Sequence, residues 1–329
     1  MFRRAKELTA TTFISITQTS NLNRNVYFLD ALGTELAGFF QNGSISYSDV
    51  RDFLLLLLMN DPSGYRLFRC SENGVPNDPL KNHGLPIIML NNKLHVQPAY
   101  YIILSSAANP QPIKVQVTTR KAVARPQSLN LTPEDPVIRG FHDRVRARDG
   151  GCVVTGARVV SSYSGFQVAH LPTRAYRPPQ LTDRHITIGE SRIRSVQNGI
   201  MMFAHVRTAF DKYEFSINPD VCLSTPLLKL FSYLRFLQES YRITCFLPDV
   251  FGIDGRHIYS NPLAPADEQP LRELLRYHWQ QAVLCNMKGR GAEYDYDLDT
   301  EGDVMGELGG MEGGKTVFEM MVVERLGNY

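Results

Sequence analysis

The chain has 329 residues, of which 43% are hydrophobic and 21% charged, and its formal net charge is +2. This composition is typical of a globular protein of about two domains. The near-neutral balance excludes a protein that is basic throughout, so any nucleic-acid-binding signal has to be local.

The five cysteines are scattered and never spaced as Cys-x-x-Cys. This argues against a disulfide framework and a cysteine-ligated zinc, and it favours a reducing compartment. The longest apolar run, residues 53–59, is far shorter than the roughly 20 residues that cross a bilayer. We therefore expect an intracellular protein, cytoplasmic or nuclear, with no membrane partner.

Residues 1–125 are predicted to form an α+β domain that is rich in strands. Residues 26–40 predict a hairpin around Gly33, and Ser46 or Ser48 can cap a helix that runs to residue 59. Further strands are expected from apolar or alternating residues between glycine, asparagine and proline clusters, at 65–70, 86–90, 100–106 and 114–119. No catalytic constellation is visible in this region.

A helix over residues 137–149 follows, with its start signalled by Thr132 and Pro133 and its end by Gly150 and Gly151. It carries four arginines: Arg139, Arg144, Arg146 and Arg148. These either form a solvated face or contact phosphates, because the helix leads into the motifs described next.

Three segments then follow in order: GCVVTG at 151–156, FQVAHLP at 166–172 and SVQNGIMMFAHVRTAFDKYEFSINPD at 195–220. Their apolar stretches predict strand, loop, strand and helix. Together they resemble the HNH nuclease family, particularly its fungal branch, whose members run Cys-x-x-Thr-Gly, Ala-His-Ile, Gln-Asn-Gly, then a histidine and Phe-Asp. Residues 274–291 and 303–308 are similar to the C-terminal signature of the same proteins. The resemblance implies a ββα-metal module over residues 126–225.

The resemblance also implies the chemistry of phosphodiester hydrolysis, which needs a base for water and a cation for the phosphate. His170 matches the base of the family, and Asn198 matches the amide that orients this base. Ligands on the final helix would hold one divalent metal, Mg²⁺ or another ion, and the partner would be DNA or RNA.

The metal ligands depart from the family pattern. A histidine is usual nine residues after the asparagine, but here Arg207 occupies that position, with the usual aspartate present as Asp211. Arg207 and Asp211 are four residues apart and share a helix face. His205 lies about 200° from Arg207 around the axis, and Ala169 stands where many family members have a ligand.

Three functions stay open. In the first, His205 and Asp211 still hold a metal in an active endonuclease. In the second, Arg207 replaces the cation, paired with Asp211, in a nucleic-acid-binding pseudonuclease. In the third, the scaffold serves a small-molecule enzyme with His170 as its base.

Residues 226–329 are expected to form a helical extension with an acidic tail. Helices are predicted over 226–245 and 271–287, the second with an apolar stripe that would pack on the module. The tail, from Glu293 to Asp303, is interpreted as a solvated competitor for the basic residues. The complete set of candidate nucleic-acid contacts is Arg139, Arg144, Arg146, Arg148, Arg174, Lys288 and Arg290. Nothing in the sequence indicates the oligomeric state.

Overall fold

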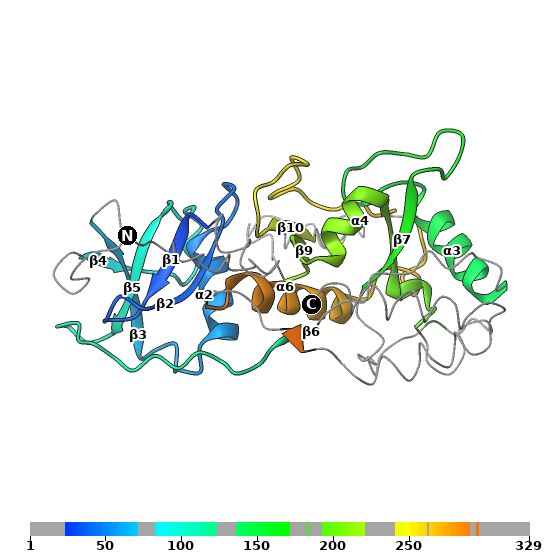
Figure 1. The fold of residues 1–329 in the computed structure, drawn as a ribbon. Coiled ribbons are helices and arrows are strands. Elements are labelled where there is room, and N and C mark those ends of the chain that lie inside the picture. Colours follow the sequence, from blue (N-terminus) through cyan, green and yellow to red (C-terminus); the bar gives the residue numbers. More distant parts are fainter. Residues whose placement is uncertain are drawn as a thin grey trace, which may run out of the picture. The chain divides into compact units, whose positions relative to one another are not determined.

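The computed structural model describes residues 24–71, 83–123, 136–171, 183, 193–220, 241–261 and 263–289, and the backbone of 294–295. The described residues fall into two compact units. Those within Met1–Gln41, Ser46–Thr118 and Asn286–Glu293 form the first, and those within Asn42–Ile45, Thr119–Cys285 and Tyr294–Tyr329 form the second. Both helices and strands are present, which confirms the α+β class (Figure 1). No helix among these residues is long and apolar enough to span a membrane.

The first unit contains a five-stranded sheet in the order β2-β1-β5-β3-β4. Its strands are β1 (Val26–Leu29), β2 (Glu35–Phe39), β3 (Tyr65–Cys70), β4 (His83–Ile87) and β5 (Ala99–Ser105). The predicted hairpin is confirmed, because β1 pairs antiparallel with β2. Asp30 Oδ1 accepts hydrogen bonds from the amides of Leu32 and Thr34 and so closes its turn.

One helix, α2 (Tyr47–Leu57), packs against this sheet through contacts such as the edge-to-face pair of Phe53 and Phe39, whose ring centroids are 6.1 Å apart. Ser46, rather than Ser48, is its cap. The Ser46 hydroxyl accepts from the amide of Asp49, and the Asp49 carboxylate accepts from the amide of Ser46, which is a capping box.

Two strand predictions in the first unit were wrong. The strand expected at 86–90 is β4, which begins three residues earlier at His83 and ends at Ile87. Residues 114–119 form no ladder strand, although they alternate in polarity. They bond instead to the end of α2, with the amide of Thr118 donating to the carbonyl of Leu57. A polarity pattern cannot distinguish these two partners.

The second unit holds α3 (Pro136–Asp149), β7 (Phe166–His170), the 3-10 turn η2 (Val196–Asn198), β8 (Gly199–Phe203) and α4 (Ala204–Asp211). It continues with the antiparallel pair β9 (Phe215–Asn218) and β10 (Arg242–Cys245), and with most of α6 (Arg272–Met287). β6 (Ala122–Val123) pairs in parallel with β11 (Tyr294–Asp295).

The helix predicted at 137–149 is confirmed as α3, and it ends at Gly150, whose φ is +58°. Its expected cap at Thr132 lies outside the described residues. The helix predicted at 271–287 is confirmed as α6, and its expected apolar stripe is buried: Leu274, Leu275, Ala282, Val283 and Leu284.

Two other predictions in this unit were wrong. Residues 151–156 form a tight turn rather than a strand, closed by the Cys152 amide donating to the carbonyl of Ala157. A Cβ at Gly151 would lie 2.3 Å from that same carbonyl oxygen, so only glycine fits. Of the helix predicted at 226–245, the end is strand β10, and residues 226–240 lie outside the described residues, as do those of the acidic tail from 296.

Candidate functional site

The strands β7 and β8 form an antiparallel two-stranded ribbon in which His170 pairs with Gly199 and Phe166 with Phe203. Figure 1 shows β7 between α4 and α3. Successive side chains of a strand point to opposite faces. Ala169 accordingly packs in the cluster that contains Val206 and Phe210 of α4, whereas Val168 packs with Phe141 and Val145 of α3.

His170 ends β7 and faces α3. Its ring is half-buried and stacks on Phe141, with ring centroids 4.8 Å apart and an interplanar angle of 22°. The next residue, Leu171, donates its amide to the carbonyl of Asn198. Gly199 is required here because a Cβ would lie 2.7 Å from Cζ of Phe141. The close approach of α3 therefore explains the glycine of the Gln-Asn-Gly motif.

Asn198 is buried, with 4% of its surface exposed. Its Nδ2 donates to the carbonyl of Ile193 at 2.8 Å, and its buried Oδ1 has no hydrogen-bond partner within the described part of the chain. Asn198 is thus tied to the His170 end of β7 through its main-chain carbonyl, while its side-chain amide braces the preceding loop.

Arg207 and Asp211 lie on the α4 side of β7. Arg207 Nε donates to Asp211 Oδ2 at 3.2 Å, and Arg207 Nη1 donates to Gln167 Oε1 of β7, also at 3.2 Å. Both side chains of the ion pair are largely buried, with 13% and 18% of their surfaces exposed. The guanidinium is therefore held in one orientation by a carboxylate and an amide.

His205 points elsewhere. It is exposed, and its ring stacks on Phe203, with centroids 5.4 Å apart and an interplanar angle of 14°. The residue before His170 is Ala169, which offers no ligand, and the Asp211 carboxylate already accepts from Arg207. Among the residues that the structure describes, no three His, Cys, Asp or Glu side chains gather into a metal-holding group. The described donor set does not fit a divalent metal.

Residues 152–218 match the family model of HNH endonucleases. The match runs from the turn at Cys152 through β7, β8 and α4 to the end of β9, and we call these residues the HNH-like module. No curated protein and no solved structure matches the chain. The module supports an assignment to the HNH type of nuclease domain, with its strand, loop, strand and helix in the expected order.

A further histidine, which the sequence analysis did not select, lies beside the HNH-like module. His142 of α3 is half-buried, and burial lowers its pKa, followed by the positive charges of Arg146 and Arg207, against the opposing effect of Asp143. Arg207 comes from α4, so its positive charge lowers the pKa of His142 although β7 separates their helices. Apart from its position next to Phe141, nothing in the sequence pointed to His142.

The four arginines of α3 differ in their surroundings. Arg139 is exposed, and Arg146 pairs with Asp143 and lies over the ring of Tyr163 at 5.0 Å. Arg144 makes two hydrogen bonds, of 3.1 and 3.0 Å, to the buried carboxylate of Asp183. Of the remaining candidates, Lys288 belongs to the first unit, while Arg174 and Arg290 lie outside the described residues.

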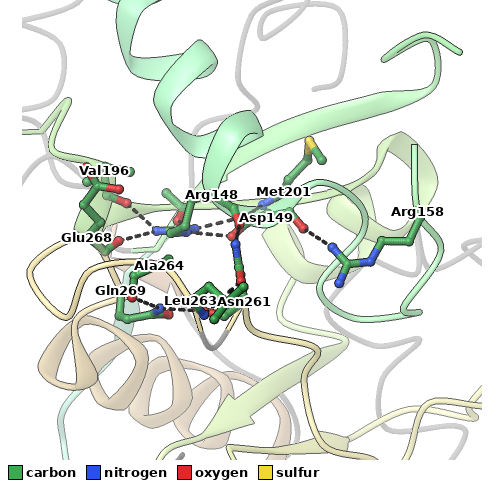
Figure 2. A network of polar contacts seen from close by, with 11 residues as sticks. Arg148, Asp149, Arg158, Val196, Met201, Asn261, Leu263, Ala264, Glu268 and Gln269 are labelled. Atoms are coloured by element: carbon green, nitrogen blue, oxygen red, sulfur yellow. Dashed lines mark hydrogen bonds and ion pairs between the residues drawn. The ribbon is translucent and has the colours of Figure 1, made fainter. Parts of the chain in front are cut away.

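Arg148 is buried, with 3% of its surface exposed, and its interpretation as a phosphate contact does not fit this position. Figure 2 shows its guanidinium at the centre of a polar network. Nε and Nη2 donate to Asp149, Nη2 also to the carbonyl of Gly199, and Nη1 to the carbonyls of Val196 and Glu268. All five N–H groups of this side chain are therefore bonded.

The network continues through Asp149, whose Oδ2 accepts from the amide of Met201 at 2.8 Å. Arg148 and Asp149 thereby connect the end of α3 to η2 and β8 on both sides of Asn198. Nothing in the local sequence distinguished this buried pair from the surface arginines. The carbonyls that bind Arg148 come from distant segments.

Proposed function

We propose that the HNH-like module binds the phosphodiester backbone of nucleic acid, with Arg207 supplying the positive charge that a divalent metal supplies in metal-dependent family members. The observation that carries this proposal is the anchoring of the Arg207 guanidinium by Asp211 and Gln167. A planar guanidinium matches the geometry of phosphate oxygens and stays charged at any physiological pH. Such a site binds nucleic acid without a metal.

A second function, endonuclease activity, is favoured by the match of residues 152–218 to HNH endonucleases. His170 is the group that would take a proton from the attacking water, because an imidazole accepts protons near neutral pH. Phe141, stacked on the ring, limits how far the imidazole can rotate. Positioning by Phe141 would keep the base at the end of β7, next to the Asn198 turn.

Binding and cleavage are tested separately. Fluorescence anisotropy with a labelled oligonucleotide should give the same affinity in EDTA and in Mg²⁺ for the native chain. Arg207→Gln should weaken this affinity by about tenfold or more, because charge-assisted hydrogen bonds are worth roughly 1.5–3 kcal/mol. Lys212 is exposed and directly follows α4, so Lys212→Gln is the control for a general loss of positive charge.

Plasmid nicking with Mg²⁺, Mn²⁺ or EDTA then compares the native chain with His170→Ala. Metal-dependent nicking that disappears in His170→Ala would support the endonuclease and displace the metal-free binding site as the main function. Binding that is abolished by EDTA would contradict the role proposed for Arg207.

A further inference from the structure

Four aromatic rings follow one another across the surface of the HNH-like module and the loop after β10. Phe166 stacks on Phe203 at 4.5 Å between centroids, Phe203 on His205 at 5.4 Å, and His205 contacts Phe251 at 5.6 Å. We call these four residues the aromatic ladder. They come from β7, β8, α4 and the loop after β10, so only the folded second unit brings them together.

The ladder is open to solvent rather than enclosed in the core. Phe166, Phe203 and Phe251 are half-buried and pack against the core with one side, and His205 is exposed. Val250, next to Phe251, has 79% of its surface exposed. Phe210 and Phe215 of the same cluster, by contrast, are fully covered.

Two arginines lie close in sequence to residues of the ladder. Arg207 follows His205 by two residues on α4 and bonds to Gln167, the neighbour of Phe166. Nη2 of Arg256 lies 3.9 Å from the position that a Cβ of residue 252, the neighbour of Phe251, would take. This combination of stacked rings and cations is what single-stranded nucleic acid binds.

We propose that the aromatic ladder is a stacking site for an unpaired base of a nucleic-acid strand that also contacts Arg207 through a phosphate. The inference rests on the proposed function and adds to it that the preferred ligand is single-stranded or locally unpaired. A base inside a duplex is already stacked on its neighbours and cannot present its face to a protein ring. An unpaired base would contact the ladder at its exposed member, His205, which lies between Phe203 and Phe251 in the row.

β7 sets the separation between the ladder and His170. Phe166 and His170 are the two ends of β7, four residues apart, which corresponds to about 13 Å at roughly 3.3 Å per residue. Arg207 contacts Gln167 between these two ends. Arg207 bonds to Gln167 from the α4 side of β7, whereas the ring of His170 stacks on Phe141 of α3.

The test uses the full chain with a single-stranded oligonucleotide that contains 2-aminopurine, whose fluorescence is quenched on stacking, and with a duplex of the same sequence. His205→Ala should lower the single-strand affinity about fivefold or more and reduce the quenching. His205→Phe should retain both, because it keeps a ring. His257→Ala, which removes another exposed imidazole of the second unit, is the matched control.

The salt dependence separates this inference from the proposed function. His205→Ala should leave the slope of log affinity against log salt unchanged, whereas Arg207→Gln should reduce it by about one. A native chain that binds neither the single strand nor the duplex overturns the proposed function and the inference with it. A His205→Ala variant that binds single strands as tightly as the native chain overturns the stacking site alone.

Discussion

Arg207 and Asp211 stand one turn apart on α4 and form an ion pair in which Nε lies 3.2 Å from Oδ2. The resemblance to HNH nucleases implied a histidine at the position that Arg207 occupies. Among the described residues, this site therefore offers one carboxylate and one guanidinium. A divalent metal would need several donors here.

The first prediction concerns Arg207→His. An imidazole at position 207 and the carboxylate of Asp211 would share one helix face and could hold a divalent metal together. We expect this variant to bind Mn²⁺ or Zn²⁺ at least about tenfold more tightly than the native chain, measured by isothermal titration calorimetry. Arg207→Gln removes the cation without adding a ligand. Equal metal affinity of the two variants would contradict the assignment of this position.

The second concerns the buried network of Arg148. Arg148→Met removes all five donors and leaves the Asp149 carboxylate in the interior without its cation. Breaking one partner of a buried ion pair costs about 3–5 kcal/mol. We expect the urea midpoint of the second unit to fall accordingly, whereas the exposed Arg139→Ala should change the free energy of unfolding by less than about 0.5 kcal/mol. An equal loss of stability in Arg148→Met and Arg139→Ala would show that the network contributes nothing to the stability of the second unit.

The third concerns the pKa of His142, which burial and then Arg146 and Arg207 lower. Because the unfolded imidazole takes up its proton near pH 6.5 and the native one only at a lower pH, the unfolded state binds more protons between these two values. Stability should therefore fall as the pH drops through this window and change no further below the native pKa. Removing one of the lowering charges, as in Arg207→Gln, should raise the pKa of His142.

An NMR titration of the His142 ring measures this directly. His142→Gln should also flatten the pH dependence of unfolding in the same window. A pKa that is unmoved by Arg207→Gln would mean that the two side chains do not interact across β7.

The fourth concerns the start of α2. Ser46→Ala should destabilise the first unit by about 1 kcal/mol, because it removes the side-chain half of the capping box with Asp49. Ser48→Ala is the matched control, since Ser48 lies in the first turn and its side chain does not cap the helix. Thermal unfolding of both variants decides between them. The opposite order of stability would contradict the capping assignment.

Local sequence signals predicted α2, α3 and α6 well, because caps, glycine stops and apolar periodicity act within a few residues. The same signals were wrong for residues 151–156 and 242–245. Short apolar runs fit a turn, a strand or a helix, and the choice depends on partners that are distant in the chain. Ile243 lies in a strand because it pairs with Ile217 of β9.

For the candidate site, the residues themselves indicated the resemblance to HNH nucleases and the unusual arginine at position 207. Their spacing also predicted that Arg207 and Asp211 share a face, since four residues make about one helical turn. These conclusions need only the order of residue types along the chain.

Only the tertiary structure decided what each charged side chain contacts. It buried Arg148 among carbonyls of η2, β8 and residue 268, left Arg139 exposed on the same helix, and gathered Phe166, Phe203, His205 and Phe251 into one ladder. The physical reason is that burial and contact depend on how separate segments pack, whereas helix caps and helix faces depend on neighbours within one turn.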